Sequence, residues 1–157
     1  MNMGTTSKLK DLKKDEKLFF IGLVIWILLQ VSRFIAINLI NDINGGEESL
    51  AWMYPAYLDI FAAVLALPLV LSILKFRGLL TWTFTIVYLV ISIVDHFGNF
   101  ITTTIVGPPS IVKEGMNPLL IPIIQTIIDF LFFVLLLAPK YYKLFFKIGR
   151  QKNIEFV

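Results

Sequence analysis

Four apolar segments, each about as long as a bilayer is thick, constrain this chain more than any other feature of its sequence. They cover residues 18–40, 55–74, 79–103 and 118–138. An α-helix needs about 20 apolar residues to cross the hydrocarbon core of a membrane, and each segment meets that length. We therefore predict an all-α integral membrane protein, built as a four-helix transmembrane bundle.

The composition supports this class and excludes several kinds of chemistry. Of the 157 residues, 57% are hydrophobic and 16% are charged, whereas soluble domains carry about 25% charged residues. The chain has no cysteine, which excludes disulfides, thiol nucleophiles and thiolate metal sites. Its single histidine excludes bis-histidine haem ligation and multi-histidine metal sites. We accordingly predict neither a cofactor nor a metal site.

Basic residues in the connecting segments predict the orientation of the chain. Cytoplasmic segments of membrane proteins are enriched in Lys and Arg. Both tails are basic and the second link contains Lys75 and Arg77, whereas the first link has no basic residue and the third has only Lys113. Both termini are therefore predicted to be cytoplasmic. Because the Ile, Lys and Phe usage suggests a prokaryote, the plasma membrane is the expected location.

The apolar segments divide the chain into a cytoplasmic polar tail (1–17), a transmembrane domain (18–138) and a basic and aromatic cytoplasmic tail (139–157). The first apolar run is too long for a signal-peptide core of about 7–15 residues, so we expect it to be retained.

In the second tail, basic and aromatic residues alternate. This pattern fits an amphipathic helix on anionic lipid or plain positive-inside anchoring. The net charge of +3 follows from the topology, so we expect a lipid bilayer as partner and no nucleic acid.

Five ionisable side chains interrupt the apolar segments: Arg33, Asp59, Asp95, His96 and Asp129. A charge at the centre of a membrane costs at least about 2.5–3.5 kcal/mol, so such residues usually face a partner or a water-filled cavity. Each of them alone could serve helix packing. Together they exceed what packing needs, and we interpret them as a functional site.

The predicted topology brings these residues to one depth, between the outer surface and the midplane. Asp95 and Asn99 share one helical face, and so do Gln125 and Asp129, because each pair is four residues apart. Polar faces at equal depth would enclose an outward-facing polar pocket within the membrane. The candidate ligand- or ion-binding residues are Arg33, Asp59, Asp95, His96, Asn99, Gln125 and Asp129.

The charges in this predicted pocket do not balance. Three aspartates face one permanent cation, Arg33, which leaves a net charge of −2 if His96 is neutral. Like charges oppose one another's ionisation, so at least one aspartate is expected to hold a proton unless a cation binds. We expect the Arg33 guanidinium to fork onto one carboxylate, because its geometry favours bidentate pairing.

Three classes of function remain open. In the first, the pocket binds or transports a proton, a cation or a small polar or amphiphilic ligand. In the second, the chain is an accessory subunit of a larger membrane complex, with its buried charges facing partner helices. In the third, it is a membrane-embedded enzyme on a lipid-like substrate, with His96 and an aspartate as acid and base. The absence of a recognised catalytic motif makes an enzyme the weakest of these, and a homo-oligomer fits the first.

Overall fold

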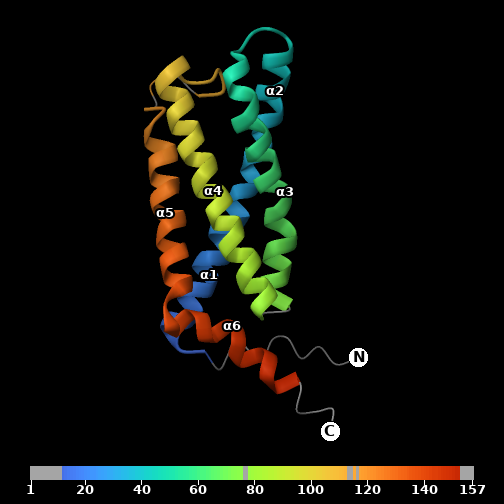
Figure 1. The fold of residues 1–157 in the computed structure, drawn as a ribbon, viewed down its shortest axis with the longest axis vertical. Helices are drawn as coiled ribbons and strands as arrows, with labels where there is room; N and C mark the ends of the chain where they lie inside the picture. Colours follow the sequence, from blue (N-terminus) through green and yellow to red (C-terminus); the bar gives the residue numbers. More distant parts are fainter. Residues whose placement is uncertain (1–11, 76–77, 113–114, 116, 153–157) are drawn as a thin grey trace.

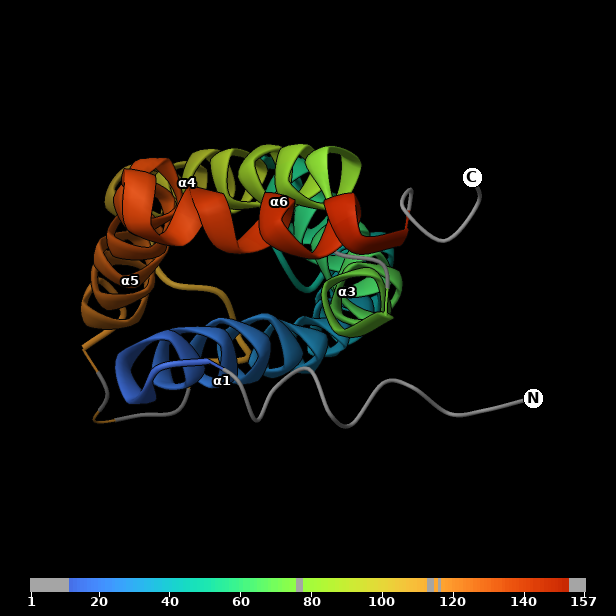
Figure 2. The same ribbon diagram turned by 90° about the horizontal axis from the view of Figure 1, so that it is seen from below.

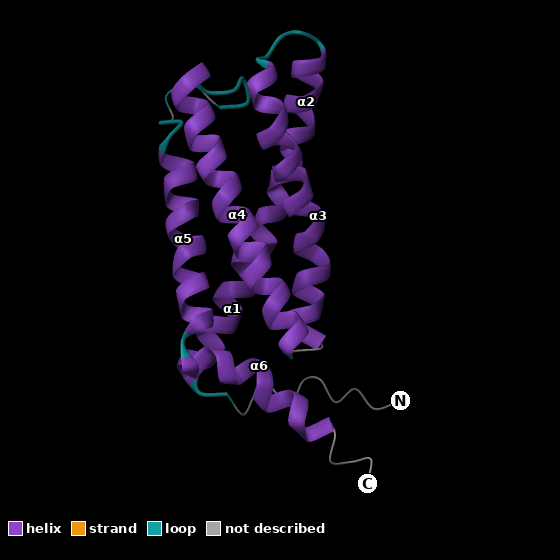
Figure 3. Cartoon of the chain, in the orientation of Figure 1, coloured by secondary structure: helices purple, strands orange, loops and turns teal. Residues whose placement is uncertain are grey.

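The computed structural model describes residues 12–75, 78–112, 115 and 117–152, and its regular structure in these ranges is entirely helical (Figure 3). Four helices are long and apolar enough to cross a membrane, which confirms the predicted helical multi-pass architecture. Their bounds are Lys14–Asn44, Leu50–Lys75, Leu79–Val106 and Leu120–Leu137.

The first of these spans is not one regular α-helix. It consists of α1 (Lys14–Leu29), a 3₁₀ segment η1 (Gln30–Ile35) and α2 (Ala36–Asn44). The second consists of a short 3₁₀ turn, η2 (Leu50–Trp52), and α3 (Met53–Lys75). The third and fourth are α4 (Leu79–Val106) and α5 (Leu120–Leu137), and a further helix, α6 (Pro139–Lys152), follows.

The spanning helices form an elongated bundle (Figure 1). The view from below places α3 and α5 on opposite sides, with α1 on one side between them and α4 on the other (Figure 2). The inner face of α3 is made of small residues, since Ala56, Ala62, Ala63 and Ala66 are all fully buried. Small side chains let helix backbones approach closely, and α3 contacts all three segments of the first span, α1, η1 and α2.

The first span extends beyond its predicted residues 18–40 at both ends, because polar turns continue the helix. At its start, the Lys13 N–H donates to Glu16 Oε2 at 3.0 Å. Asp15 and Glu16 lie in the first turn, where negative charge is favoured by the helix dipole. Residues 1–11 of the predicted polar tail lie outside the described residues.

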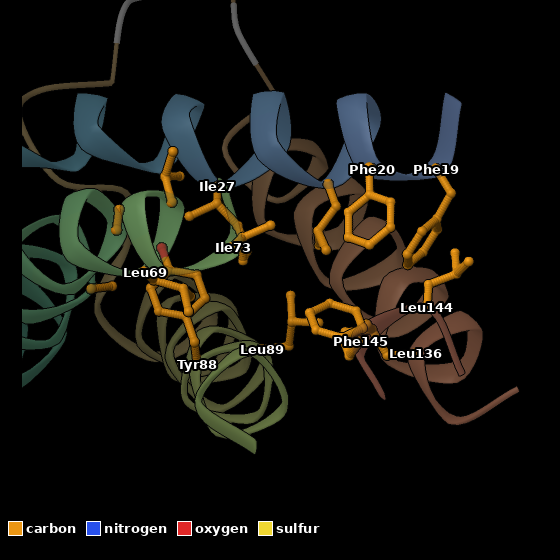
Figure 4. Close-up of a cluster of buried hydrophobic side chains, with 14 residues drawn as sticks. Phe19, Phe20, Ile27, Leu69, Ile73, Tyr88, Leu89, Leu136, Leu144 and Phe145 are labelled. Carbon is orange, nitrogen blue, oxygen red and sulfur yellow. The ribbon is translucent and has the colours of Figure 1, made fainter. Parts of the chain in front are cut away.

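A hydrophobic core fills the end of the bundle near α6 (Figure 4). Leu144 and Phe145 of α6 are buried in it, and the ring centroids of Phe20 and Phe145 are 5.4 Å apart. Lys140 pairs with Asp15 of α1. The helix in the C-terminal tail therefore packs on the bundle, and its contact with a membrane surface stays a prediction.

At the opposite end, the link between α4 and α5 folds onto the loop that follows α2. The Ser110 N–H donates to Glu48 Oε2 at 2.7 Å, and the Ser110 hydroxyl donates to Asp42 Oδ2 at 3.0 Å. The N–H of Ser110 beside Glu48 lowers the pKa of that carboxyl below its ordinary value of 4.5. Ile111 packs on a second core cluster that includes Trp52.

Candidate functional site

The 3₁₀ segment η1 presents two buried polar side chains, Gln30 and Arg33, to the interior of the bundle. In a 3₁₀ helix, side chains three residues apart eclipse one another. Arg33 Nε accordingly donates to Gln30 Oε1 at 2.7 Å, and Gln30 Nε2 donates to the Trp26 carbonyl at 3.3 Å. The change from α to 3₁₀ geometry thus builds a polar platform in the middle of an apolar helix.

From this platform the Arg33 guanidinium reaches α3 and α4. Its Nη1 donates to Asp95 Oδ2 at 2.7 Å and lies 3.5 Å from Asp59 Oδ1. Its Nη2 donates to Ser92 Oγ at 2.6 Å and contacts His96 Nε2 at 2.5 Å. One cation therefore ties η1 to both neighbouring helices.

The prediction that Arg33 forks onto one carboxylate is wrong. Gln30 occupies Nε, so that nitrogen is not available for a bidentate pair. The two terminal nitrogens are divided among Ser92, Asp95 and His96, which α4 supplies within little more than one turn. No single carboxylate receives more than part of the Arg33 charge.

His96 joins this network to α5. A guanidinium has only donors, so a neutral His96 must accept from Arg33 through Nε2 and carry its hydrogen on Nδ1. Asp129 Oδ2 lies 3.3 Å from the same Nε2, and Asp129 Oδ1 accepts from Trp26 Nε1 at 2.6 Å. His96 Nε2 therefore lies between a donor, the Arg33 guanidinium, and an acceptor, the Asp129 carboxylate. A proton added to Nε2 would exchange its contact with Arg33 for an ion pair with Asp129.

Several buried polar atoms near Arg33 have no hydrogen-bond partner in the described part of the chain. They are Asp95 Oδ1, Asp129 Oδ2 and the Tyr88 hydroxyl. A buried polar group without a partner costs about 1–3 kcal/mol, and more when it is charged. The cluster thus keeps two carboxylate oxygens that a proton or a hydrogen-bond donor would satisfy.

The structure brings five of the seven predicted site residues together: Arg33, Asp59, Asp95, His96 and Asp129. Four of them are buried, and Asp59, with 22% of its side chain exposed, is the most accessible. The other two, Asn99 and Gln125, are half-buried, and among the described residues no hydrogen bond or ion pair joins them to the cluster.

Three further residues, Gln30, Ser92 and Trp26, belong to this network and were not among the predicted site residues. Ser92 precedes His96 by one turn, and Trp26 holds Asp129. Trp26 lies four and seven residues before Gln30 and Arg33, a spacing that puts all three on one helical face. A tryptophan at mid-span rather than near the membrane interface is the signal that could have identified it.

The cluster lies nearer the end of the bundle that is opposite α6. Arg33 is eleven residues from the end of α2, and Asp59 is nine residues from the start of η2. At a rise of about 1.5 Å per residue, both lie roughly 15 Å below that end.

An apolar groove of about 480 Å³ runs between α3 and α4. It is lined by Phe61, Leu65 and Pro68 of α3 and by Phe84, Val87 and Tyr88 of α4, among others. Phe61, Phe84 and Val87 are also exposed on the outside of the bundle, so the groove is open along its side.

Comparisons with protein-family models, with curated proteins and with solved structures find no match to this chain. Within the ranges that the structure describes, no three His, Asp or Glu side chains are grouped closely enough to hold a metal ion.

Proposed function

We propose that this chain is a multi-pass membrane protein that binds a proton, or a cation that takes its place, in the buried cluster around Arg33. The observation that carries the proposal is the excess of carboxyl groups over permanent cations in the cluster. Three carboxylates, on Asp59, Asp95 and Asp129, face one permanent cation, and two of their buried oxygens have no hydrogen-bond partner.

Electrostatics makes this surplus costly when nothing is bound. With His96 neutral, the cluster would carry a net charge of −2 away from water, where charges interact far more strongly than in solvent. A proton on one carboxyl, or a bound cation, reduces that charge. Organic ammonium groups fit the two open carboxylate oxygens, because they carry only donors.

His96 supplies a mechanism by which occupancy would change the helix contacts. In its neutral form, Nε2 accepts from Arg33 of η1. When a proton arrives on Nε2, Arg33 is repelled and Asp129 of α5 becomes the favoured partner. Binding in the cluster is therefore coupled to the contacts that α4 makes with η1 and α5.

The proposal includes an orientation with both termini in the cytoplasm and a location in the plasma membrane. The orientation is supported by the basic residues of both tails and of the link at Lys75 and Arg77. In this orientation the cluster lies in the outer half of the membrane, so ligands approach it from the outer side or from the lipid phase.

The pH dependence of unfolding tests the proposal. If the folded cluster holds a proton that the unfolded chain releases, the free energy of unfolding falls as pH rises, by about 1.4 kcal/mol per pH unit for each proton. The groups that set this dependence are Arg33, Asp59, Tyr88, Asp95, His96 and Asp129. The measurement is the thermal stability of the purified chain in nanodiscs between mildly acidic and mildly alkaline pH.

Two variants and one control make this test specific. Asp95→Asn and Asp129→Asn should flatten the pH profile, because each removes one carboxyl from the cluster. Glu47→Gln removes an exposed acid of the loop after α2 and should leave the profile unchanged. Identical profiles in the wild type and in both aspartate variants would refute the proposal.

A further inference from the structure

Two carboxyl groups of the cluster, those of Asp59 and Asp95, meet at one nitrogen of Arg33. Arg33 Nη1 donates to Asp95 Oδ2 at 2.7 Å and lies 3.5 Å from Asp59 Oδ1. The two carboxyl groups are also close enough for a side-chain hydrogen bond between them. Asp59 of α3 and Asp95 of α4 therefore form a carboxyl pair where these two helices pack together.

This carboxyl pair lacks a hydrogen-bond donor. An ionised carboxylate can only accept, so two ionised groups cannot form a hydrogen bond with one another. Asp95 Oδ1 is buried and has no partner among the described residues. One proton held by the pair turns one of its carboxyl groups into a donor. It also removes one of two negative charges that oppose each other in a buried site.

Asp129, the third acid of the cluster, is placed differently. Its Oδ1 accepts from Trp26 Nε1 at 2.6 Å. Its Oδ2 lies 3.3 Å from His96 Nε2, the nitrogen that would donate to it once His96 is protonated. Asp129 therefore has a donor and a possible cation beside it, whereas the carboxyl pair must divide the single charge of Arg33.

Arg33 also determines which ligand the carboxyl pair can hold. Because Nη1 contacts both carboxyl groups, a metal ion or an ammonium group bound at the pair would lie next to the guanidinium and be repelled by it. A proton needs no space of its own, because it is held on a carboxyl oxygen. With one proton, the pair has a charge of −1, which matches the charge of Arg33.

Asp59 connects the buried pair with its surroundings. Its side chain is 22% exposed, whereas the side chains of Arg33 and Asp95 are 5% and 0% exposed. A proton can therefore bind and leave at Asp59 while Asp95 stays shielded.

We infer that Asp59 and Asp95 share one proton, that this proton is the ligand of the site, and that it enters and leaves through Asp59. The O–H bond forms on Asp59, which then donates to Asp95. This inference rests on the proposed function and names the ligand and the groups that hold it. The other charged or titratable groups around the pair are Arg33 of η1, Tyr88 and His96 of α4, and Asp129 of α5.

Infrared spectroscopy of carboxyl variants tests the sharing of the proton. The purified full-length chain is measured in nanodiscs of uncharged lipid, in amine-free buffer, from mildly acidic to mildly alkaline pH. The wild type should show the carbonyl band of one protonated carboxyl. Asp59→Asn and Asp95→Asn should each lose this band, because the remaining carboxyl then has Arg33 as its own ion-pair partner. Asp129→Asn keeps both groups of the pair and should keep the band.

The pH dependence of unfolding gives a second, independent test. For one proton, the folding equilibrium constant changes up to tenfold per pH unit. Asp59→Asn, Asp95→Asn and the double variant should lose this dependence to the same extent, because each of them removes the same proton. Glu47→Gln, at an exposed position, should behave like the wild type. If the aspartate variants do not fold, the carboxyl NMR signals of Asp59 and Asp95 in the wild type should still titrate over one common pH range.

The outcomes separate this inference from the proposed function. Loss of the infrared band in Asp129→Asn alone, or its survival in Asp59→Asn, would overturn the inference and leave the proposed function standing. A double variant that loses more pH dependence than either single variant would overturn it by showing two separate protons. Identical pH profiles in the wild type, Asp95→Asn and Asp129→Asn would instead refute the proposed function.

Discussion

Removing the Arg33 side chain is the sharpest perturbation that this structure suggests. Arg33 is the one permanent cation of the cluster and has contacts with Gln30, Ser92, Asp95 and His96. In Arg33→Met, the apolar stem stays and the charge disappears. The buried carboxylate of Asp95 then loses its ion-pair partner.

The structure gives a magnitude for this loss. Removing one partner from a buried ion pair costs about 3–5 kcal/mol, because the other charge is left uncompensated. For a chain of this size, each kcal/mol lowers the melting temperature by about 2–4 °C. We therefore expect Arg33→Met to melt about 6–20 °C below the wild type at neutral pH.

The assay is thermal unfolding in nanodiscs, followed by intrinsic tryptophan fluorescence. Lys75→Met removes a positive charge from the exposed end of α3 and should change the melting temperature little. The double variant Arg33→Met with Asp95→Asn should recover at least half of the loss, because the orphaned charge is gone. Lower pH should also restore stability, since protonation neutralises the carboxylates. Equal melting temperatures of Arg33→Met and Lys75→Met, or a double variant no more stable than Arg33→Met, would refute the role of Arg33 as the partner of Asp95.

Three further predictions concern single contacts. Trp26→Phe keeps an aromatic ring but removes the donor to Asp129, so the free energy of unfolding should fall by about 1.5–3 kcal/mol. The same substitution in an Asp129→Leu background, which has no acceptor, should cost clearly less, and equal costs would contradict the contact. Because the Ser110 N–H lowers the pKa of Glu48 below 4.5, the contact should hold above that pH and weaken as pH falls through the lowered pKa; the NMR shift of the Ser110 amide should titrate there in the wild type but not in Glu48→Gln. Phe145→Ala empties a fully buried site between α6 and the bundle and should cost about 3–5 kcal/mol in thermal or denaturant unfolding, whereas Phe130→Ala, at an exposed position of α5, should cost much less.

The spans could be predicted from the sequence because apolar length is a direct requirement of a bilayer. Their ends could not, because Lys14 and Asn44 are polar residues that still belong to helical turns. The 3₁₀ segment was also not predicted, since apolar periodicity assumes regular α-helix throughout. That segment is the feature that eclipses Gln30 and Arg33 and builds the platform of the cluster.

Charged site residues were easier to predict than neutral ones. An unpaired charge in an apolar span has a high free-energy cost, so Arg33 and Asp95 each required a partner. In the structure they form an ion pair with one another. Asn99 and Gln125 are neutral amides with a smaller cost of burial, so their presence in a span does not require a shared site. Trp26 was missed because an indole is apolar enough for a span, and only its position away from the membrane interface indicated a buried acceptor, which proved to be Asp129.

Infrared spectroscopy of the buried carboxyl groups tests the central claim most directly. The purified chain would be measured in nanodiscs at neutral pH, in amine-free buffer, beside Asp95→Asn and Asp129→Asn. The acid surplus around Arg33 predicts a carbonyl band from a protonated carboxyl in the wild type, and predicts its loss in at least one of the two variants. A wild-type spectrum in which every carboxyl is ionised at neutral pH would contradict the account.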